Sequence, residues 1–217
     1  MKIEAPATLL FDNDGTLLSS MESVIRCWTA WAEEYGITAE EFAAAGLHGR
    51  PAGEIVRDLV PAERAAEALA RIERMEVEDV ERGGVVALPG TAELLASLPE
   101  GSWAVVTSAT RELAEARLRQ VGIRAPLVIS ADDITRGKPD PEPYLLAAAK
   151  LGVDPARCVV FEDAPAGLES GRAAGMRTVG LATTHTREEL GADVVVENLS
   201  SVSAQVTADG VAIVVED

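Results

Sequence analysis

Short apolar runs alternate with helical patterns along most of this chain, and that alternation is the strongest constraint on its fold. The helical patterns span 91–98, 111–121, 142–151 and 166–174. Alternation of this kind predicts a parallel sheet covered by helices on both faces, and near-continuous apolar strands suit such a buried sheet. We therefore expect an α/β fold with a doubly wound, Rossmann-like sheet. The expected strands are 8–11, 103–107, 127–129, 158–161 and 178–181, with 194–196 as a sixth.

Two segments depart from this alternation. Residues 18–87 contain helical patterns (43–47, 53–60, 62–80) and no convincing strand, so we expect an inserted helical domain of 18–87 within a core of 1–17 and 88–217. Near the C-terminus, Asp209-Gly210 between two apolar runs predicts a tight antiparallel hairpin, expected at one edge of the sheet. The first inserted helix should bury one apolar face, because its large apolar residues recur at helical spacing: Met21, Val24, Ile25, Trp28, Trp31 and Tyr35.

Polar side chains stand at or just after the ends of several expected strands. In doubly wound sheets, ligands bind beyond the carboxyl ends of the strands. Each group alone has an ordinary alternative as a turn, a helix cap or a solvated charge. Together they predict one site, and the groups are Asp12 with Asp14, Thr107 with Ser108, Lys138 in the loop 135–141, and Glu162 with Asp163.

These residue types form a chemically complete set for phosphoryl transfer. A carboxylate can attack phosphorus to give an aspartyl-phosphate, and a second carboxyl can protonate the leaving oxygen and later activate water. A lysine ammonium, a hydroxyl and backbone N–H groups can hold the phosphoryl oxygens. Several acids in one pocket repel each other and a phosphate dianion, so a divalent cation such as Mg²⁺, which prefers oxygen ligands, is expected as the cofactor.

Charge and cysteine content exclude several other classes of function. A net charge of −17 argues against nucleic-acid or anionic-membrane partners, since both need a basic face. No stretch approaches the ~20 apolar residues of a membrane helix, and the first residues show no secretion signal. Cys27 and Cys158 fit no metal-binding spacing and read as small buried residues. We expect a cytoplasmic protein whose partner is a small phosphorylated metabolite, and the oligomeric state stays open.

The four polar groups, in this order, resemble the haloacid dehalogenase superfamily of phosphohydrolases, and the resemblance covers nearly the whole chain. It implies that Asp12 is the nucleophile and Asp14 the acid and base. The segment 18–87 resembles the helical cap of that family, which closes over small substrates. The remaining roles that the resemblance implies are phosphate binding by Thr107, Ser108 and Lys138, and magnesium binding by Asp12, the Asp14 carbonyl and Asp163, with Glu162 supporting the metal indirectly.

A narrower resemblance indicates the substrate class. Segments 102–111, 137–145 and 160–167 look like the branch that contains glycerol-phosphate and deoxyglucose-phosphate phosphatases. The expected activity is therefore hydrolysis of a small sugar or polyol phosphate. A β-phosphoglucomutase-like phosphosugar mutase would use the same two aspartates, and a catalytically silent binding protein is the non-enzyme alternative. In the cap, His48 and Arg50 either contact the substrate or belong to a solvated helix connection.

Overall fold

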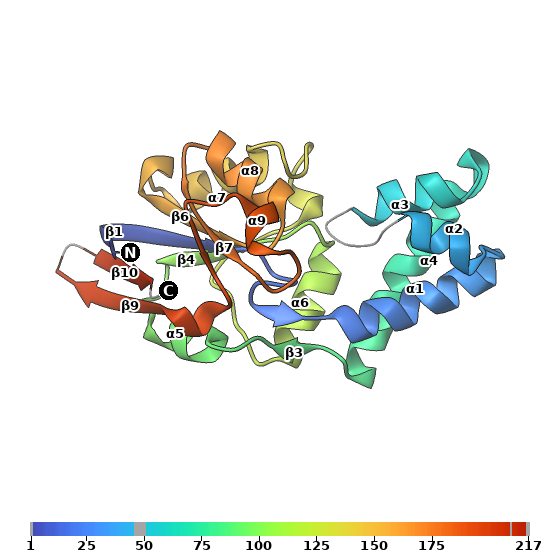
Figure 1. The fold of residues 1–217 in the computed structure, drawn as a ribbon, viewed down its shortest axis with the longest axis horizontal. Coiled ribbons are helices and arrows are strands. Elements are labelled where there is room, and N and C mark those ends of the chain that lie inside the picture. Colours follow the sequence, from blue (N-terminus) through green and yellow to red (C-terminus); the bar gives the residue numbers. More distant parts are fainter. Residues whose placement is uncertain (1, 46–50, 209, 216–217) are drawn as a thin grey trace.

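A sheet of six parallel strands forms the centre of the protein (Figure 1), and the computed structural model describes residues 2–45, 51–208 and 210–215. This confirms the predicted α/β class. In the strand order β5-β4-β1-β6-β7-β8, the first strand of the chain, β1, lies between β4 and β6. In sheet order the strands are β5 (Val128–Ile129), β4 (Trp103–Val106), β1 (Lys2–Phe11), β6 (Cys158–Glu162), β7 (Arg177–Leu181) and β8 (Val194–Val196).

Helices cover both faces of the sheet because successive strand residues point to opposite sides. Leu9 and Phe11 pack in one core with α5 (Thr91–Ser97) and α6 (Arg111–Gln120). Leu10 packs in the other core with α7 (Glu142–Leu151), and Ala174, which directly follows α8 (Pro165–Ala173), belongs to the same core. The remaining short elements are α9 (Arg187–Leu190) and four 3₁₀ turns at Val80–Arg82, Ala131–Asp133, Pro155–Arg157 and Leu199–Ser201.

The predicted C-terminal hairpin is present, but it does not lie at an edge of the parallel sheet. Strands β9 (Val202–Thr207) and β10 (Gly210–Val215) pair antiparallel, and β10 pairs with the first half of β1 from Lys2 to Ala7. The expectation was wrong because β1 is longer than its apolar core. Its parallel pairing begins only at Thr8, so the preceding residues offer free backbone groups to β10.

The inserted segment forms a separate group of helices with its own core, at the right of Figure 1. Trp31 is fully buried, and its Nε1 donates a hydrogen bond to the Ala68 carbonyl at 2.9 Å. Ile25 was expected on the buried apolar face of the first helix, but it is 51% exposed. The helices are α1 (Met21–Tyr35), α2 (Ala39–Ala45), α3 (Ala52–Leu59) and α4 (Ala62–Asp79).

Two very short strands join this helical segment to the sheet domain. β2 (Leu18–Ser19) and β3 (Val86–Ala87) pair antiparallel where the chain enters and leaves the insertion. The expectation that 18–87 contains no strand was therefore wrong. Strands of two residues are too short to show an alternating pattern in the sequence. Within the described ranges, no helix combines the length and apolar content that a membrane crossing needs.

Candidate active site

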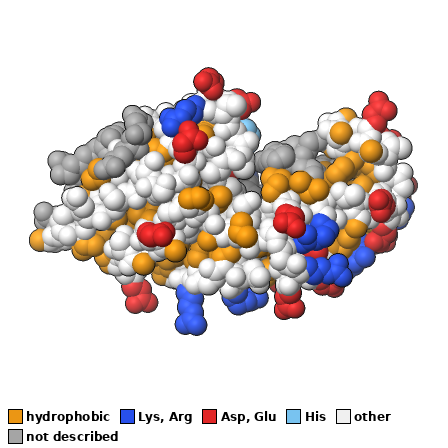
Figure 2. All heavy atoms as spheres, turned by 60° about the horizontal axis from the view of Figure 1, so that its bottom comes forward, with side chains coloured by type: hydrophobic (Ala, Val, Ile, Leu, Met, Phe, Trp, Pro, Cys, Tyr) orange, Lys and Arg blue, Asp and Glu red, His pale blue; other side chains and the backbone are white. Residues whose placement is uncertain are grey.

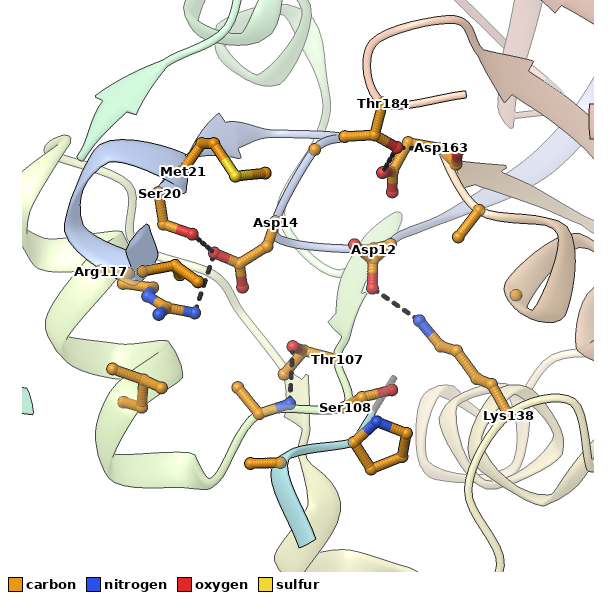
Figure 3. Close-up of a pocket in the computed structure, with 18 of the residues that line it drawn as sticks. Asp12, Asp14, Ser20, Met21, Thr107, Ser108, Arg117, Lys138, Asp163 and Thr184 are labelled. Carbon is orange, nitrogen blue, oxygen red and sulfur yellow. Dashed lines mark hydrogen bonds and ion pairs between the residues drawn. The ribbon is translucent and has the colours of Figure 1, made fainter. Parts of the chain in front are cut away.

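Three neighbouring strands bring the expected site residues together at the carboxyl ends of the parallel strands. Asp12 directly follows β1, Thr107 follows β4, and Glu162 ends β6 with Asp163 next to it. The registers Phe11↔Val105 and Phe11↔Phe161 align these three strand ends. Their side chains, with that of Lys138, line a cavity of about 240 Å³ between the sheet and the inserted helices (Figure 3).

Lys138 reaches this cavity from the loop before α7 and joins two of the acids. Its Nζ lies 2.6 Å from Asp12 Oδ1 and 2.6 Å from Glu162 Oε1, and it donates a third hydrogen bond to the Val106 carbonyl at 2.9 Å. Burial alone would lower the pKa of Lys138, but the Asp12 and Glu162 carboxylates outweigh it and raise that pKa. The ammonium therefore stays charged across the neutral range and is held beside Asp12.

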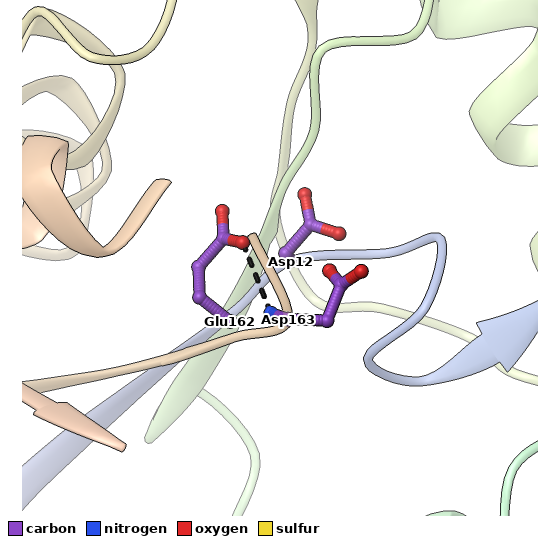
Figure 4. Close-up of side chains that lie close together, drawn as sticks. All are labelled: Asp12, Glu162 and Asp163. Carbon is purple, nitrogen blue, oxygen red and sulfur yellow. Dashed lines mark hydrogen bonds between the residues drawn. The ribbon is translucent and has the colours of Figure 1, made fainter. Parts of the chain in front are cut away.

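Asp12, Glu162 and Asp163 form a buried acidic cluster (Figure 4), with one oxygen of each within 4.8 Å of the others. Burial raises the pKa of Asp12 well above its ordinary value, and burial together with the Glu162 charge raises the pKa of Asp163 to about 7. When all three acids are ionised, their negative charge exceeds the one positive charge of the Lys138 ammonium. A divalent cation with a preference for oxygen ligands would neutralise that charge.

The oxygens of Glu162 are already occupied by hydrogen-bond donors. Lys138 and the Tyr144 hydroxyl, at 2.9 Å, donate to Oε1, while the N–H groups of Asp163 and Ala164 donate to Oε2. Asp12 and Asp163 keep more free acceptor capacity than Glu162. They are therefore the members of the cluster that fit direct contact with a metal ion, with Glu162 supporting them.

Glycines allow the backbone to approach this cluster closely. Gly15 has φ +90°, and a Cβ there would lie 2.2 Å from Asp163 Oδ2. A Cβ on Gly167, in the first turn of α8, would lie 1.8 Å from Glu162 Oε1. A side chain at either position would force the neighbouring carboxylate to move, because real contacts of a Cβ atom do not fall below about 3 Å.

Thr107 and Ser108 supply the hydroxyl side of the cavity. Thr107 is buried, its N–H donates to the Ile129 carbonyl at 2.8 Å, and its Oγ1 accepts from the Ala109 N–H at 3.1 Å. Ser108 is exposed and lies below Asp12 in Figure 3. The loop after β4 thus presents two hydroxyl groups to the space beside the nucleophile candidate.

Asp14 faces away from Lys138, toward Ser20 and Arg117 (Figure 3). Its Oδ1 accepts hydrogen bonds from Ser20 Oγ at 2.6 Å and from Arg117 Nη1 at 3.0 Å. Its Oδ2 accepts from Asn13 Nδ2 at 3.1 Å. The two aspartates of the loop therefore have separate cationic partners, Lys138 for Asp12 and Arg117 for Asp14.

Sequence reasoning missed several residues of this site. Arg117 and Glu76 are buried and lie in the cavity wall, and Tyr144 donates its hydroxyl to Glu162. The sequence did contain a sign of the first two residues. Arg117 and Glu76 are charged but fall on the buried face of their helices, one turn after Leu113 and Ile72 respectively. His48 and Arg50, expected at the substrate, lie outside the described residues, so that expectation stays a prediction.

Comparison with known proteins points to one family. The sequence profile described as haloacid dehalogenase-like hydrolase matches residues 6–175. Hexitol phosphatase A of Escherichia coli K12 is 42% identical over 176 residues, which is 79% of this chain and 81% of that protein. Glycerol-1-phosphate phosphohydrolase 2 of Saccharomyces cerevisiae is 35% identical over 89% of this chain and 82% of that protein. The structure of CbbY from Rhodobacter sphaeroides, in complex with phosphate, superimposes with a TM-score of 0.77 at 26% identity and covers 88% of this chain and 94% of that one.

Proposed function

The chain belongs to the haloacid dehalogenase-like hydrolases and is a phosphatase of that family, and we propose that it hydrolyses a small sugar or polyol phosphate with Mg²⁺ as cofactor. One observation supports the proposal above all others. Asp12, Thr107 and the Glu162–Asp163 pair converge from neighbouring strand ends on one cavity, and Lys138 joins them from the loop before α7. The substrate class is supported by the relatives, which are named as hexitol and glycerol-1-phosphate phosphatases.

In the proposed reaction, Asp12 attacks the phosphorus atom of the ester. The bond between phosphorus and the leaving oxygen breaks while Asp14 gives that oxygen its proton, which leaves an aspartyl-phosphate and a free alcohol. Asp14, now a carboxylate, takes a proton from a water molecule that attacks the same phosphorus, and the bond between phosphorus and the Asp12 oxygen breaks to restore the Asp12 carboxylate. Inorganic phosphate leaves, and both aspartates return to their starting protonation states.

The other residues bind and orient the transferred group. In this proposal Lys138, which contacts Asp12, neutralises a phosphoryl oxygen, and Thr107 and Ser108, which line the cavity, donate hydrogen bonds to the remaining oxygens. Asp12, Asp163 and the Asp14 carbonyl would hold Mg²⁺, with Glu162 fixing their positions. The bound metal ion would neutralise negative charge on the acids and on the phosphate.

The inserted segment 18–87 is proposed to act as the cap that encloses the alcohol part of the substrate. Met21, Val24, Trp28 and Ile55 line the cavity on that side, so much of the described cap wall is apolar. In this proposal His48 and Arg50 supply further contacts to the leaving group. Specificity would then be set by the cap and the common phosphoryl chemistry by the sheet domain.

The test is phosphate release from a panel of sugar, polyol and aryl phosphates, with and without Mg²⁺. The expected result is continuous release of inorganic phosphate, fastest with a sugar or polyol ester, and its loss in excess chelator. Isomerisation of a sugar phosphate only when a bisphosphate primer is added would instead identify a mutase. Failure to turn over any ester would favour a silent binding protein.

A further inference from the structure

Arg117 is a buried cation at the meeting point of the sheet domain and the inserted helices. It lies on α6, is 4% exposed, and lines the cavity beside Asp14 (Figure 3). Its Nη1 donates to Asp14 Oδ1 at 3.0 Å, and its Nη2 donates to Glu76 Oε1 on α4 at 3.1 Å. One guanidinium therefore links the proposed acid and base to the proposed cap.

The position of this guanidinium depends on those two carboxylates. Within the described ranges, Nε of Arg117 is buried and has no hydrogen-bond partner, so Asp14 and Glu76 provide its hydrogen-bonded anchors. Burial would lower the pKa of Arg117, but the two carboxylates outweigh it and raise that pKa. The guanidinium therefore stays charged and is fixed between one group of the sheet domain and one of the cap.

Arg117 is also separate from the residues that face the phosphoryl group. Lys138 contacts Asp12 and Glu162, whereas Arg117 contacts Asp14 and Glu76. Both Arg117 and Ser20 donate to Oδ1 of Asp14, which fixes the rotation of that carboxyl group, while Oδ2 accepts from the adjacent Asn13 amide and, among the described residues, from no other side chain. Oδ2 is thus the oxygen that can exchange a proton with the leaving group.

We propose that Arg117 is a positioning residue for Asp14, and that Glu76 of the cap holds Arg117 in the orientation that Asp14 requires. The inference rests on the proposed function, because it assigns Asp14 the transfer of a proton to the leaving oxygen. It predicts that the effect of changing Arg117 depends on the leaving group of the ester. An alkyl ester needs that proton for its alkoxide to leave, whereas an ester of an acidic phenol needs it far less.

The experiment compares kcat/KM for glycerol phosphate and for 4-nitrophenyl phosphate in Arg117→Gln. For each ester, kcat/KM reports the steps up to release of the alcohol, so later hydrolysis of the aspartyl-phosphate does not mask the effect. We expect a loss of about 10-fold or more with glycerol phosphate, part of the roughly 10²–10⁴-fold that a general acid supplies. The loss with 4-nitrophenyl phosphate should be several times smaller. Equal losses on both esters would overturn the proposal.

A second variant and a matched control separate positioning from general damage to the cap. Glu76→Gln keeps an acceptor for Arg117 but removes its countercharge, so it should give the same ester dependence with a smaller loss. If Arg117→Gln does not fold, Glu76→Gln decides in the same way. Arg26→Gln is the control, because the Arg26–Asp79 ion pair joins α1 to the end of α4 and Arg26 is not a cavity residue. It should leave the ratio of the two esters unchanged.

A double-mutant comparison distinguishes failure of this inference from failure of the proposed function. Asp14→Asn alone should sharply lower kcat/KM for glycerol phosphate, and adding Arg117→Gln should lower it little further, because Arg117 acts through Asp14. An unchanged rate in Asp14→Asn would contradict the proposed function itself. A large loss in Asp14→Asn with a fully additive second loss would contradict only the role given to Arg117.

Discussion

At the residue scale, the site separates two aspartates that stand only two positions apart. Asp12 is buried against Lys138, while Asp14 is partly exposed and bound by Ser20 and Arg117. Two carboxyl groups with different surroundings can take different roles in one reaction. The proposed mechanism needs such a difference, since it gives the two aspartates separate roles.

Replacing the proposed nucleophile tests that assignment. Asp12→Asn should reduce phosphatase activity by several orders of magnitude, because an amide is a poor nucleophile toward phosphorus. The measurement is steady-state phosphate release, with circular dichroism as the check on folding. The side chain keeps its size and can still accept a hydrogen bond from Lys138, so the fold should persist. Activity near that of the original protein would rule out the aspartyl-phosphate route.

The two cysteines should be chemically inert in the folded protein. Burial raises the pKa of the Cys27 thiol to about 12 and that of the Cys158 thiol to about 11. Since the thiolate is the reactive form and both pKa values are raised, very little of it exists at pH 8. Iodoacetamide at that pH should label neither thiol quickly in native protein and both in denaturant, as measured by mass spectrometry. Rapid labelling of either native thiol would contradict this prediction.

At the element scale, the sequence predicted the strands and helices whose periodicity is long and clear. The alternation around the sheet and the helices α3 and α4 followed from apolar spacing alone. The pair β2 and β3 could not be predicted, because two-residue strands depend on each other for pairing and carry no pattern. The partner of β10 was also hidden, since residues 2–7 lack the apolar run that marks the rest of β1.

The same reasoning explains which parts of the candidate site were predicted. Asp12, Thr107 and Asp163 stand at strand ends, where polar residues after an apolar run are visible in the sequence, and Lys138 stands in the loop 135–141. Arg117 and Glu76 lie within helices and meet only when α4 packs beside α6. Their contact depends on how the cap lies against the sheet domain, which helical spacing alone does not specify.

The start of α8 provides a prediction about a close approach between elements. Gly167→Ala would place a Cβ in the space of the Glu162 carboxylate, which binds Lys138 and Tyr144. Glu162 would have to move, so we expect kcat/KM to fall at least ~10-fold and stability to fall by about 1–3 kcal/mol, as in other overpacked interiors. Denaturant unfolding and phosphate release are the measurements.

Gly53→Ala is the matched control for this prediction. Gly53 also lies in the first turn of a helix, but among the described residues a Cβ there would meet Leu69 Cδ2 at an ordinary 3.5 Å. That variant should keep its activity and equal or slightly exceed the original stability, because alanine favours helix. Similar damage in both variants would show that helix substitution itself, and not the contact with Glu162, is responsible.

At the scale of the whole molecule, a strongly acidic protein has to accept an anionic substrate. The net charge of −17 repels a phosphate dianion at long range, and three of the acids that contribute to it are buried at the cavity where the phosphate must bind. Lys138 provides one compensating charge beside Asp12. Binding of Mg²⁺ would supply two more, so we expect metal binding, substrate binding and stability to be linked.

This linkage predicts that stabilisation by Mg²⁺ grows with pH. The pKa of Asp163 is raised from its ordinary 3.8 to about 7, mainly by burial, so the metal-free fold holds this proton more tightly than the unfolded chain does. The resulting stability is fully present below 3.8 and is lost as pH rises through about 7. Mg²⁺ binds the deprotonated acids, so protons compete with it at low pH.

Thermal unfolding with and without Mg²⁺ at pH 5.5 and pH 8.5 measures this effect. At pH 8.5, Mg²⁺ at about 100 times its Kd should stabilise the fold by about 2.7 kcal/mol, or roughly 5–10 °C in Tm. At pH 5.5 the same concentration should give a clearly smaller shift. Asp163→Asn is the control: it should raise the Tm of the metal-free protein at pH 8.5 and remove most of the gain from Mg²⁺. A shift of equal size at both pH values would show that Asp163 does not control metal binding.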